Sequence, residues 1–403
     1  MSWEKTTIGE YCTVTSSKRF HLSDRSNSGV PFYCSKEIIQ KVKSEKIDSC
    51  DYISEEFYEE VARKYGVPQE NDLLVTTRGT IGIPYLYKKS DRFYFADGNL
   101  TWMKDFRSTL LPQYLYYWFL SHEGQRKIDS IAKGTAQKAV PIAGIKTLEM
   151  LLPPIETQRR IADILSTYDD LIENNRKQIK LLEEAAQRLY KEWFVDLHFP
   201  GHEHTKIMDG VPEGWERAHL SDIADINANN IPKNYCFNYI EYTDLSAVQN
   251  GIIREKTRYA LNEAPGRAKR MANDGDIIWG MVRPNLKSFA LVLHPTETDV
   301  FSTGFCVLSA KKVPFTYLYY AVTTESFIKY LVNCTNGAAY PAVKPIHFSE
   351  AEIILPHEKI LKRFNIVVEP MLRKRERLLL IINQASQARD RLLPKLMSGE
   401  VEV

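Results

Sequence analysis

Apolar residues recur at seven-residue intervals along two long stretches of the chain. The first stretch runs from about Ile155 to Trp193. Two apolar rows three residues apart, sustained over several heptads, are the seam of a coiled coil and need a partner helix. At 1.5 Å per residue the predicted helix is roughly 55 Å long. One row is Leu165, Ile172, Ile179, Ala186 and Trp193, and the other is Tyr168, Asn175, Leu182 and Leu189.

The second stretch, from about Ile360 to Leu396, repeats this seam 203 residues later. Arg375 and Arg389 interrupt its apolar row and are expected to weaken it, and Pro370 is expected to kink the helix or delay its start. We expect the two helices to pair with each other; the alternative is that each packs on its own globular domain. The rows are Val368, Arg375, Ile382, Arg389 and Leu396, and Met371, Leu378, Ala385 and Leu392.

Each long helix follows a segment of about 150 residues with mixed character. Short apolar runs such as Leu73–Thr77 and Ala290–Leu293 are bounded by Gly, Pro and Asn, and they predict strands. The tyrosine-rich segments Pro112–Ser121 and Pro314–Thr323 predict short helices. Their tyrosines could form a platform for stacking bases, but at helical spacing we expect them in the core.

The second half of the chain repeats the first. Tyr114–Tyr117 recurs as Tyr317–Tyr320, at an offset of 203 residues. The offset is 204 at Asp72 and Asp276 and larger before them, because the first copy has about eight extra residues early in the repeat. We expect an α+β fold of two similar mixed α/β domains and two long helices, arranged as a pseudo-twofold internal repeat. The expected boundaries are 1–153 for the first domain, 154–197 for its helix, 198–214 for a linker, 215–356 for the second domain, and 357–403 for the last helix and tail.

The composition is that of an ordinary globular protein. Of the 403 residues 44% are hydrophobic and 26% charged, and the net charge is +2. A charge this small neither requires nor excludes nucleic acid, whose binding would need local clusters of basic residues. The start of the chain lacks a signal-peptide pattern, the apolar runs are too short to span a membrane, and the six cysteines form no CxxC pair. We therefore expect a cytoplasmic protein without disulfides.

The sequence lacks the motifs of common catalytic sites. It contains no GxxxxGK[ST] loop for a nucleotide and no Asn-Pro-Pro-Tyr or Asp-Pro-Pro-Tyr run of an amino-methyltransferase. Gly79–Gly82 is a GxxG fragment that fits a simple turn. His198, His202 and His204 lie in the linker without a thiolate or a structured hairpin, so we expect no metal site. We expect neither a catalytic residue nor a bound cofactor on this chain.

Three segments resemble conserved regions of one protein family. Leu189–Asp196 followed by Phe199–Gly201 is similar to the central conserved region of the specificity subunit of Type I restriction-modification enzymes. Leu392–Glu400 is similar to the family's C-terminal conserved region, and Leu152–Gln158 to the start of its helix. The order of variable domain, helix, variable domain and helix is the family's architecture, so the resemblance covers the whole chain.

The resemblance implies that each variable segment is a target recognition domain for one half of a split site, read in the major groove of double-stranded DNA. The helices would form an antiparallel coiled coil that fixes the spacer and docks modification subunits, of which we expect two. Those subunits would bind S-adenosylmethionine and methylate adenine, while restriction subunits would use ATP and Mg. The alternative is a coiled-coil scaffold that binds proteins and no nucleic acid. The residues expected at coil and partner contacts are Leu165, Ile172, Ile179, Leu182, Leu189, Trp193, Leu378, Ile382, Leu392 and Leu396.

Basic and amide side chains in loops are the candidates for DNA contact, with Lys and Arg on phosphates and bidentate Arg, Asn or Gln on bases. Arg78 and Arg283 follow matching strands and are expected at matching places. The repeated loops at Gly134 and Gly337 fit DNA contact and a tight turn equally well. Single surface lysines are commonly only solvated, so the loops are considered as groups. The candidates are Lys18, Arg19, Arg25, Arg78, Lys133, Gln137 and Lys138 in the first domain, and Arg267, Lys269, Arg270, Arg283, Asn285, Lys287, Tyr340 and Lys344 in the second.

Overall fold

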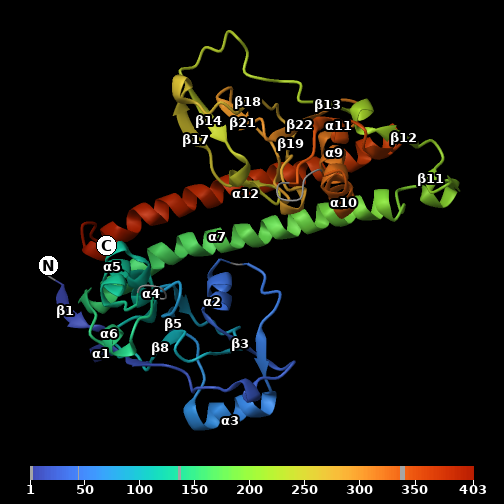
Figure 1. The fold of residues 1–403 in the computed structure, drawn as a ribbon. Coiled ribbons are helices and arrows are strands. Elements are labelled where there is room, and N and C mark those ends of the chain that lie inside the picture. Colours follow the sequence, from blue (N-terminus) through green and yellow to red (C-terminus); the bar gives the residue numbers. More distant parts are fainter. Residues whose placement is uncertain (1–2, 44, 135–137, 336–340) are drawn as a thin grey trace. The chain divides into compact units, whose positions relative to one another are not determined.

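The chain is described by a computed structural model that covers residues 3–43, 45–134, 138–335 and 341–403 (Figure 1). It forms two compact units. Unit 1 consists of Met1–Glu173 together with Ile382–Val403, and unit 2 consists of Asn174–Ile381. Each unit therefore combines one globular domain with parts of both long helices.

The strands of unit 1 form small sheets. They are β1 Glu4–Thr7, β2 Thr13–Thr15, β3 Val30–Tyr33, β4 Asp51–Ile53, β5 Leu73–Thr76, β6 Pro84–Leu86, β7 Tyr94–Phe95, β8 Leu100–Lys104 and β9 Glu149–Leu152. One antiparallel sheet has the order β2-β8-β5-β6, and a second has the order β4-β3-β7 with β3 and β7 parallel. The antiparallel pair β1–β9 joins the start of the domain to the segment that leads into the long helix.

The short helices of unit 1 are α1 Ile8–Tyr11, α2 Ser35–Val42, α3 Glu55–Tyr65, α4 Pro112–Leu120, α5 His122–Ile131 and α6 Ile142–Lys146, with a 3₁₀ turn at Leu22–Asp24. The tyrosines of α4 confirm the prediction of a core position, because Tyr114 and Tyr117 are buried beside Trp118. The Tyr114 hydroxyl also donates to the Leu151 carbonyl at 2.9 Å, which ties α4 to β9.

Unit 2 repeats this topology. Its strands are β10 Ile207–Met208, β11 Val211–Pro212, β12 Glu216–His219, β13 Ala224–Ile226, β14 Tyr239–Thr243, β15 Val248–Gln249, β16 Ile252–Ile253, β17 Thr257–Ala260, β18 Ala268–Arg270, β19 Ile277–Gly280, β20 Phe289–Leu291, β21 Asp299–Ser302, β22 Phe305–Ala310 and β23 Glu352–Leu355. The sheet β13-β22-β19-β20 matches β2-β8-β5-β6, the parallel pair β14–β21 matches β3–β7, and the pair β12–β23 matches β1–β9. The predicted internal repeat is therefore confirmed.

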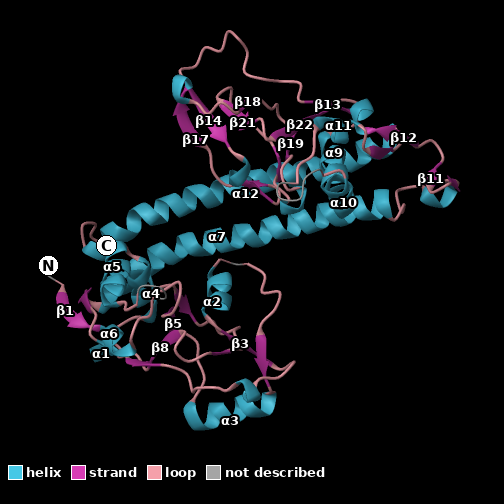
Figure 2. Ribbon diagram, in the orientation of Figure 1, coloured by secondary structure: helices cyan, strands magenta, loops and turns pink. Residues whose placement is uncertain are grey.

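The short helices of unit 2 are α8 Leu220–Ile223, α9 Phe315–Thr323, α10 Glu325–Asn333 and α11 Pro345–Ser349, with 3₁₀ turns at His202–His204, Leu245–Ala247, Leu261–Glu263 and Pro284–Leu286. The copies differ mainly early in the repeat, where the sequence offset drifts. Between β3 and β5 the first domain contains α2, β4 and α3, whereas between β14 and β19 the second contains the hairpin β15–β16, the strand β17 that matches β4, and the strand β18 (Figure 2). The later part of each copy keeps both its register and its structure.

The long helices are α7, Ile155–Tyr190, which continues into a π-helical turn at Lys191–Val195, and α12, Glu358–Ser398. They pair in antiparallel fashion inside each unit (Figure 1). In unit 1 Asp169 of α7 contacts Arg389 of α12, and in unit 2 Glu183 contacts Arg375. The ten residues predicted for the coil are all buried or half-buried. The helices also enter the domain cores, so both packing modes weighed from the sequence occur together.

One expectation about α12, a start delayed by Pro370, is wrong. Pro370 does not delay the helix, which starts at Glu358 and runs through the proline. Val368 and Leu372 on either side of it are buried in the core of unit 2, and this packing outweighs the local penalty of proline. The two seam arginines each have an acidic partner on α7. No helix among the described residues is long and apolar enough to cross a membrane.

Candidate nucleic-acid interface

The hairpin loops that follow β5 and β19 are the most closely matched candidate surfaces of the two domains. The Val140 N–H donates to the Thr77 carbonyl, and the Val343 N–H donates to the Met281 carbonyl, both at 2.9 Å. Because Val140 and Val343 are repeat partners, Thr77 corresponds to Met281. The same backbone contact therefore anchors the start of the loop in each unit.

Arg78 and Arg283 do not hold matching places, contrary to the expectation from the sequence. Arg78 and Val282 form the same β-bridge, each to an alanine, and these alanines are 203 residues apart. Arg283 consequently corresponds to Gly79. The second loop, residues 281–288, is one residue longer than the first, residues 77–83, and this difference misled an alignment made on the arginines alone.

Two further basic residues of the first domain lie near the Arg78 loop. The guanidinium of Arg19 is 3.3 Å from Asp97, and two residues later the Asn99 carbonyl accepts a hydrogen bond from the Thr77 N–H at 2.8 Å. Lys18 and Arg19 are exposed. Arg25 pairs with Asp51 of β4 at 2.6 Å.

The segment around Lys133 and Lys138 also joins this group. The Gly79 N–H donates to the Lys138 carbonyl at 3.2 Å, and Lys133 exchanges two backbone hydrogen bonds with Ala139 at 2.8 and 2.9 Å. Both lysines are exposed, and the Lys138 ammonium is 2.9 Å from Asp129. Lys133 and Lys138 thus place two exposed cations next to the backbone of the Arg78 loop. Gln137 lies outside the described residues.

In the second domain Arg267 and Arg283 come from loops that meet at one strand end. The Thr303 N–H donates to the Arg267 carbonyl at 2.8 Å, and the Met281 N–H donates to the carbonyl of Gly304, the next residue, at 2.9 Å. Arg267 and Arg283 are both exposed.

The remaining candidates of the second domain differ in their surroundings. Asn285 is exposed in the same loop as Arg283, and Lys344 is exposed at the start of α11. Lys269 is exposed on β18, whereas its neighbour Arg270 is half-buried and donates to Asn230 at 3.0 Å. Tyr340 lies outside the described residues.

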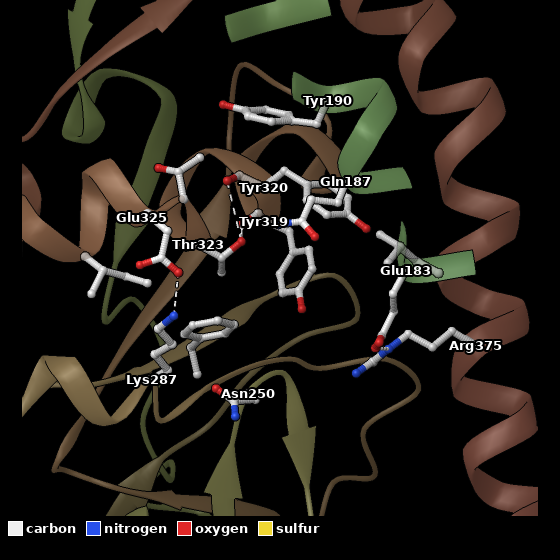
Figure 3. A pocket seen from close by; sticks show the side chains of 14 residues that line it. Glu183, Gln187, Tyr190, Asn250, Lys287, Tyr319, Tyr320, Thr323, Glu325 and Arg375 are labelled. Carbon is white, nitrogen blue, oxygen red and sulfur yellow. Dashed lines mark hydrogen bonds and ion pairs between the residues drawn. The ribbon is translucent and has the colours of Figure 1, made fainter. Parts of the chain in front are cut away.

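A cavity of about 310 Å³ lies in unit 2 where α7 and α12 meet the second domain (Figure 3). Figure 3 shows the ion pair of Lys287 with Glu325 on one side and that of Arg375 with Glu183 on the other. Arg375 is buried, and its guanidinium also donates to the Gly251 carbonyl at 2.7 Å. Burial acts to lower the pKa of Arg375, but its interactions with Tyr319 and Glu183 outweigh burial and raise that pKa above the ordinary value. Arg375 therefore ties the paired helices to the second domain.

Unit 1 has a cavity of about 400 Å³ at the corresponding place, beside Arg389. Tyr117 and Leu120 line this cavity. Their repeat partners Tyr320 and Thr323 line the cavity of unit 2. The junction between helix and domain is thus built alike in both units. Among the described residues no group of three or more His, Cys, Asp or Glu side chains is placed to hold a metal ion.

Comparisons with known proteins agree with this architecture. The family model described as the Type I restriction modification DNA specificity domain matches residues 1–184 and again residues 212–369. The MjaIX specificity subunit of a Type I restriction enzyme from Methanocaldococcus jannaschii is 27% identical over 352 residues, which cover 82% of this chain and 78% of that protein. The MjaVIII specificity subunit of the same organism is 24% identical over 423 residues, covering 100% of this chain and 93% of that protein.

Among solved structures, the S subunit of a Type I restriction-modification system from M. genitalium superposes with a TM-score of 0.66 at 15% identity, covering 98% of this chain and 96% of the other. This likeness shows the shared fold. The two matches to the family model coincide with the two copies of the repeat seen in the sequence and in the sheet topology. The chain belongs to the family of DNA specificity subunits of Type I restriction-modification systems.

Proposed function

We propose that this chain selects the DNA sequence for its complex by contacting one half of a split site with each of its two recognition domains. The observation that carries this proposal is the repeated hairpin loop, which is held by the same backbone contacts in both units and carries an exposed arginine in each, Arg78 and Arg283. Arginine is suited to bidentate contact with a base edge in the major groove. Lys18, Arg19 and Arg267 nearby would bind phosphates.

The chain would supply sequence choice and no chemistry of its own. It lacks a nucleotide-binding loop and the methyltransferase motifs named above. S-adenosylmethionine would be bound by modification subunits, and ATP and Mg would be used by restriction subunits. We place the assembled complex in the cytoplasm, where its DNA substrate is.

The paired helices would dock the modification subunits and set the spacer between the half-sites. Several large apolar side chains point away from the seam and are exposed: Leu181 (64%) on α7, and Ile366 (72%) and Leu380 (53%) on α12. These exposed apolar side chains would be available for contact with a modification subunit. Two modification subunits would fit a scaffold made of two repeats.

Sequencing the methylome of cells that carry the complete system tests this function. We expect methylated adenines in a motif of two short halves separated by a fixed spacer. A genome without such a motif, in cells that express the modification subunits, would contradict the proposal. Gel-shift titration of the complex over a salt series separates it from a protein scaffold, because phosphate contacts make DNA affinity fall steeply with salt, whereas a scaffold would show no binding.

A further inference from the structure

A series of polar contacts in unit 2 connects the two long helices to the Arg283 loop. The guanidinium of Arg375 on α12 contacts Glu183 of α7 through Nε at 2.5 Å (Figure 3). Through Nη2 it also donates to the Gly251 carbonyl, in the turn between β15 and β16, at 2.7 Å. The Gly251 N–H in turn donates to the Phe289 carbonyl at 2.8 Å, directly after the loop. Gly251 thus connects the helix pair to the end of the Arg283 loop.

The contact between Arg375 and Gly251 is so close that it requires glycine. Gly251 has a left-handed backbone, with φ of 81°, which glycine adopts freely. A Cβ atom built on it would lie 2.7 Å from the Tyr319 hydroxyl oxygen and 3.3 Å from Nη2 of Arg375. Arg375 is itself buried. Packing on both sides therefore fixes the geometry of this contact.

Packing alone gives no reason for an arginine at position 375. The residue that matches it in the repeat, 203 positions earlier, is Ile172 of α7, which is buried as well. An apolar side chain thus fills the matching place in unit 1. Replacing a buried ion pair by well-packed apolar residues is often neutral or stabilising, so the pair is weak evidence of added stability. What the guanidinium does supply is a rigid planar set of donors, which can hold two elements at a set distance.

The other end of the β19–β20 hairpin is also held by α12. Arg373 contacts both carboxylate oxygens of Asp274, shortly before β19, at 3.4 and 2.9 Å. The same carboxylate accepts a hydrogen bond from the His294 N–H, shortly after β20, at 2.8 Å. Because residues two apart on a helix do not face the same side, Arg373 and Arg375 hold the hairpin at two separate points. Removing the Arg375 contact would leave the Arg373 contact in place.

We propose that Arg375 is a positioning residue, which through Gly251 holds the Arg283 loop at a fixed place on the helix pair and thereby makes the complex strict about the length of the spacer. This inference rests on the proposed function. A spacer that is one base pair too long or too short displaces the second half-site by about 3.4 Å along the DNA. In the wild-type chain the loop can follow this displacement only if the hydrogen bond from Arg375 to Gly251 breaks.

The test compares Arg375→Leu and Arg375→Lys with the wild-type chain, each in the complete complex with its modification subunits. The substrates are oligonucleotides that carry both half-sites of the wild-type methylome motif, with the original spacer or one that is a base pair longer or shorter. Leucine removes the guanidinium. Lysine keeps the charge opposite Glu183, but its single ammonium lacks the planar fork that contacts Glu183 and Gly251 together.

Arg389→Leu is the matched control. It removes the corresponding ion pair between the helices in unit 1, whereas the Arg283 loop belongs to unit 2. All assays are run below the melting temperature of every variant. The control therefore separates the loss of an ion pair between the helices from the loss of the contact with the loop.

We expect the wild-type complex to prefer the original spacer. In the Arg375 variants this preference should fall roughly 10- to 100-fold, because the hydrogen bond to a charged group that a wrong spacer would break is already absent. Base preference within each half-site should stay unchanged, and Arg389→Leu should keep the wild-type spacer preference. Arg375→Lys should melt closer to the wild type than Arg375→Leu, so a relaxed spacer in the lysine variant would not follow from lost stability.

Two results would overturn the inference. An unchanged spacer preference in both Arg375 variants would show that this residue does not position the loop, while the proposed function would stand. An equal relaxation in Arg389→Leu would make the loss of helix pairing the cause. Relaxation in either Arg375 variant with an unchanged control supports the inference, and Arg375→Lys decides if Arg375→Leu does not assemble. If the wild-type complex gave no bipartite motif at all, the proposed function would fail together with the inference.

Discussion

Arg389 and Asp169 form an ion pair between α12 and α7 in unit 1, with 2.5 Å between Nη1 and Oδ1. The other carboxylate oxygen of Asp169 accepts a hydrogen bond from the Tyr117 hydroxyl at 2.8 Å. In unit 2 Arg375 and Glu183 form the corresponding pair, also at 2.5 Å. From the first pair to the second the residue number rises by 14 on α7 and falls by 14 on α12. Both pairs therefore fit one antiparallel register with two heptads between them.

Removing only Arg389 from the ion pair of unit 1 should destabilise the chain more than replacing both of its partners by leucine. Arg389→Leu leaves a half-buried carboxylate with the Tyr117 hydroxyl as its remaining partner, and we expect a loss of about 1–3 kcal/mol in the free energy of unfolding. The double variant Asp169→Leu with Arg389→Leu should lose less than the sum of the single changes. Urea denaturation of the four chains gives the coupling energy. Additive losses would mean that the contact contributes no stability.

A matched lengthening of both helices should change the spacer of the DNA site alone. Seven residues inserted into α7 after Asp169 and before Glu183, and seven into α12 after Arg375 and before Arg389, would preserve both ion pairs. One heptad adds roughly 10 Å of helix, or about three base pairs of DNA. We expect methylome sequencing to show both half-sites unchanged and a spacer longer by about three base pairs.

The control for this experiment is the same insertion in α7 alone, which cannot satisfy both ion pairs in one register. We expect that variant to melt at a lower temperature and to methylate poorly. Should the matched variant change base preference while its spacer stays constant, the helices would not act as the spacer ruler.

Much of the architecture followed from the sequence because it depends on local pattern. The heptad rows predicted both long helices, and the tyrosine runs predicted the buried helices α4 and α9. The partners of Arg375 and Arg389 were not predicted. A charge in a helix seam is favourable only if the opposite helix has an acidic residue at the same level of the antiparallel register. The sequence did contain one usable signal, since the two arginines and the acids Asp169 and Glu183 have the same spacing.

The candidate site was predicted less well. The conformation of its loops depends on backbone hydrogen bonds to distant residues, and no periodic pattern in the sequence predicts such bonds. Matching Arg78 with Arg283 was wrong by one residue, and the bonds from Val140 and Val343 together with the two β-bridges place Arg78 opposite Val282. Lys287 was among the candidates for DNA contact, and its ammonium is paired with Glu325 of α10.

The stability of unit 1 should depend on the charge of Asp72, which is buried just before β5. Its carboxylate accepts hydrogen bonds from the Trp102 ring and the Gln69 N–H, both at 2.8 Å, but burial raises its pKa above the ordinary value of 3.8. The folded state therefore binds a proton more readily than the unfolded state, so stability falls as the pH rises through the window above 3.8.

Asp72→Asn removes this buried charge, and its amide oxygen can still accept both hydrogen bonds. We expect a melting temperature at pH 7 that is no lower than that of the wild type, and a weaker dependence on pH above about pH 4. The measurement is thermal denaturation at a series of pH values. A lower melting temperature of the variant at pH 7 would show that the Trp102 and Gln69 donors require the full negative charge.

Exchanging one recognition domain should change one half of the recognised site. We expect a chain in which residues 1–150 are replaced by those of another specificity subunit to methylate a motif with one new half, one original half and the original spacer. The physical reason is that the contacts of the Arg78 loop lie within unit 1, whereas those of the Arg283 loop lie within unit 2. The reciprocal exchange of residues 215–356 is the matched control and should alter only the other half. A change in both halves after either exchange would show that the two recognition domains do not act independently.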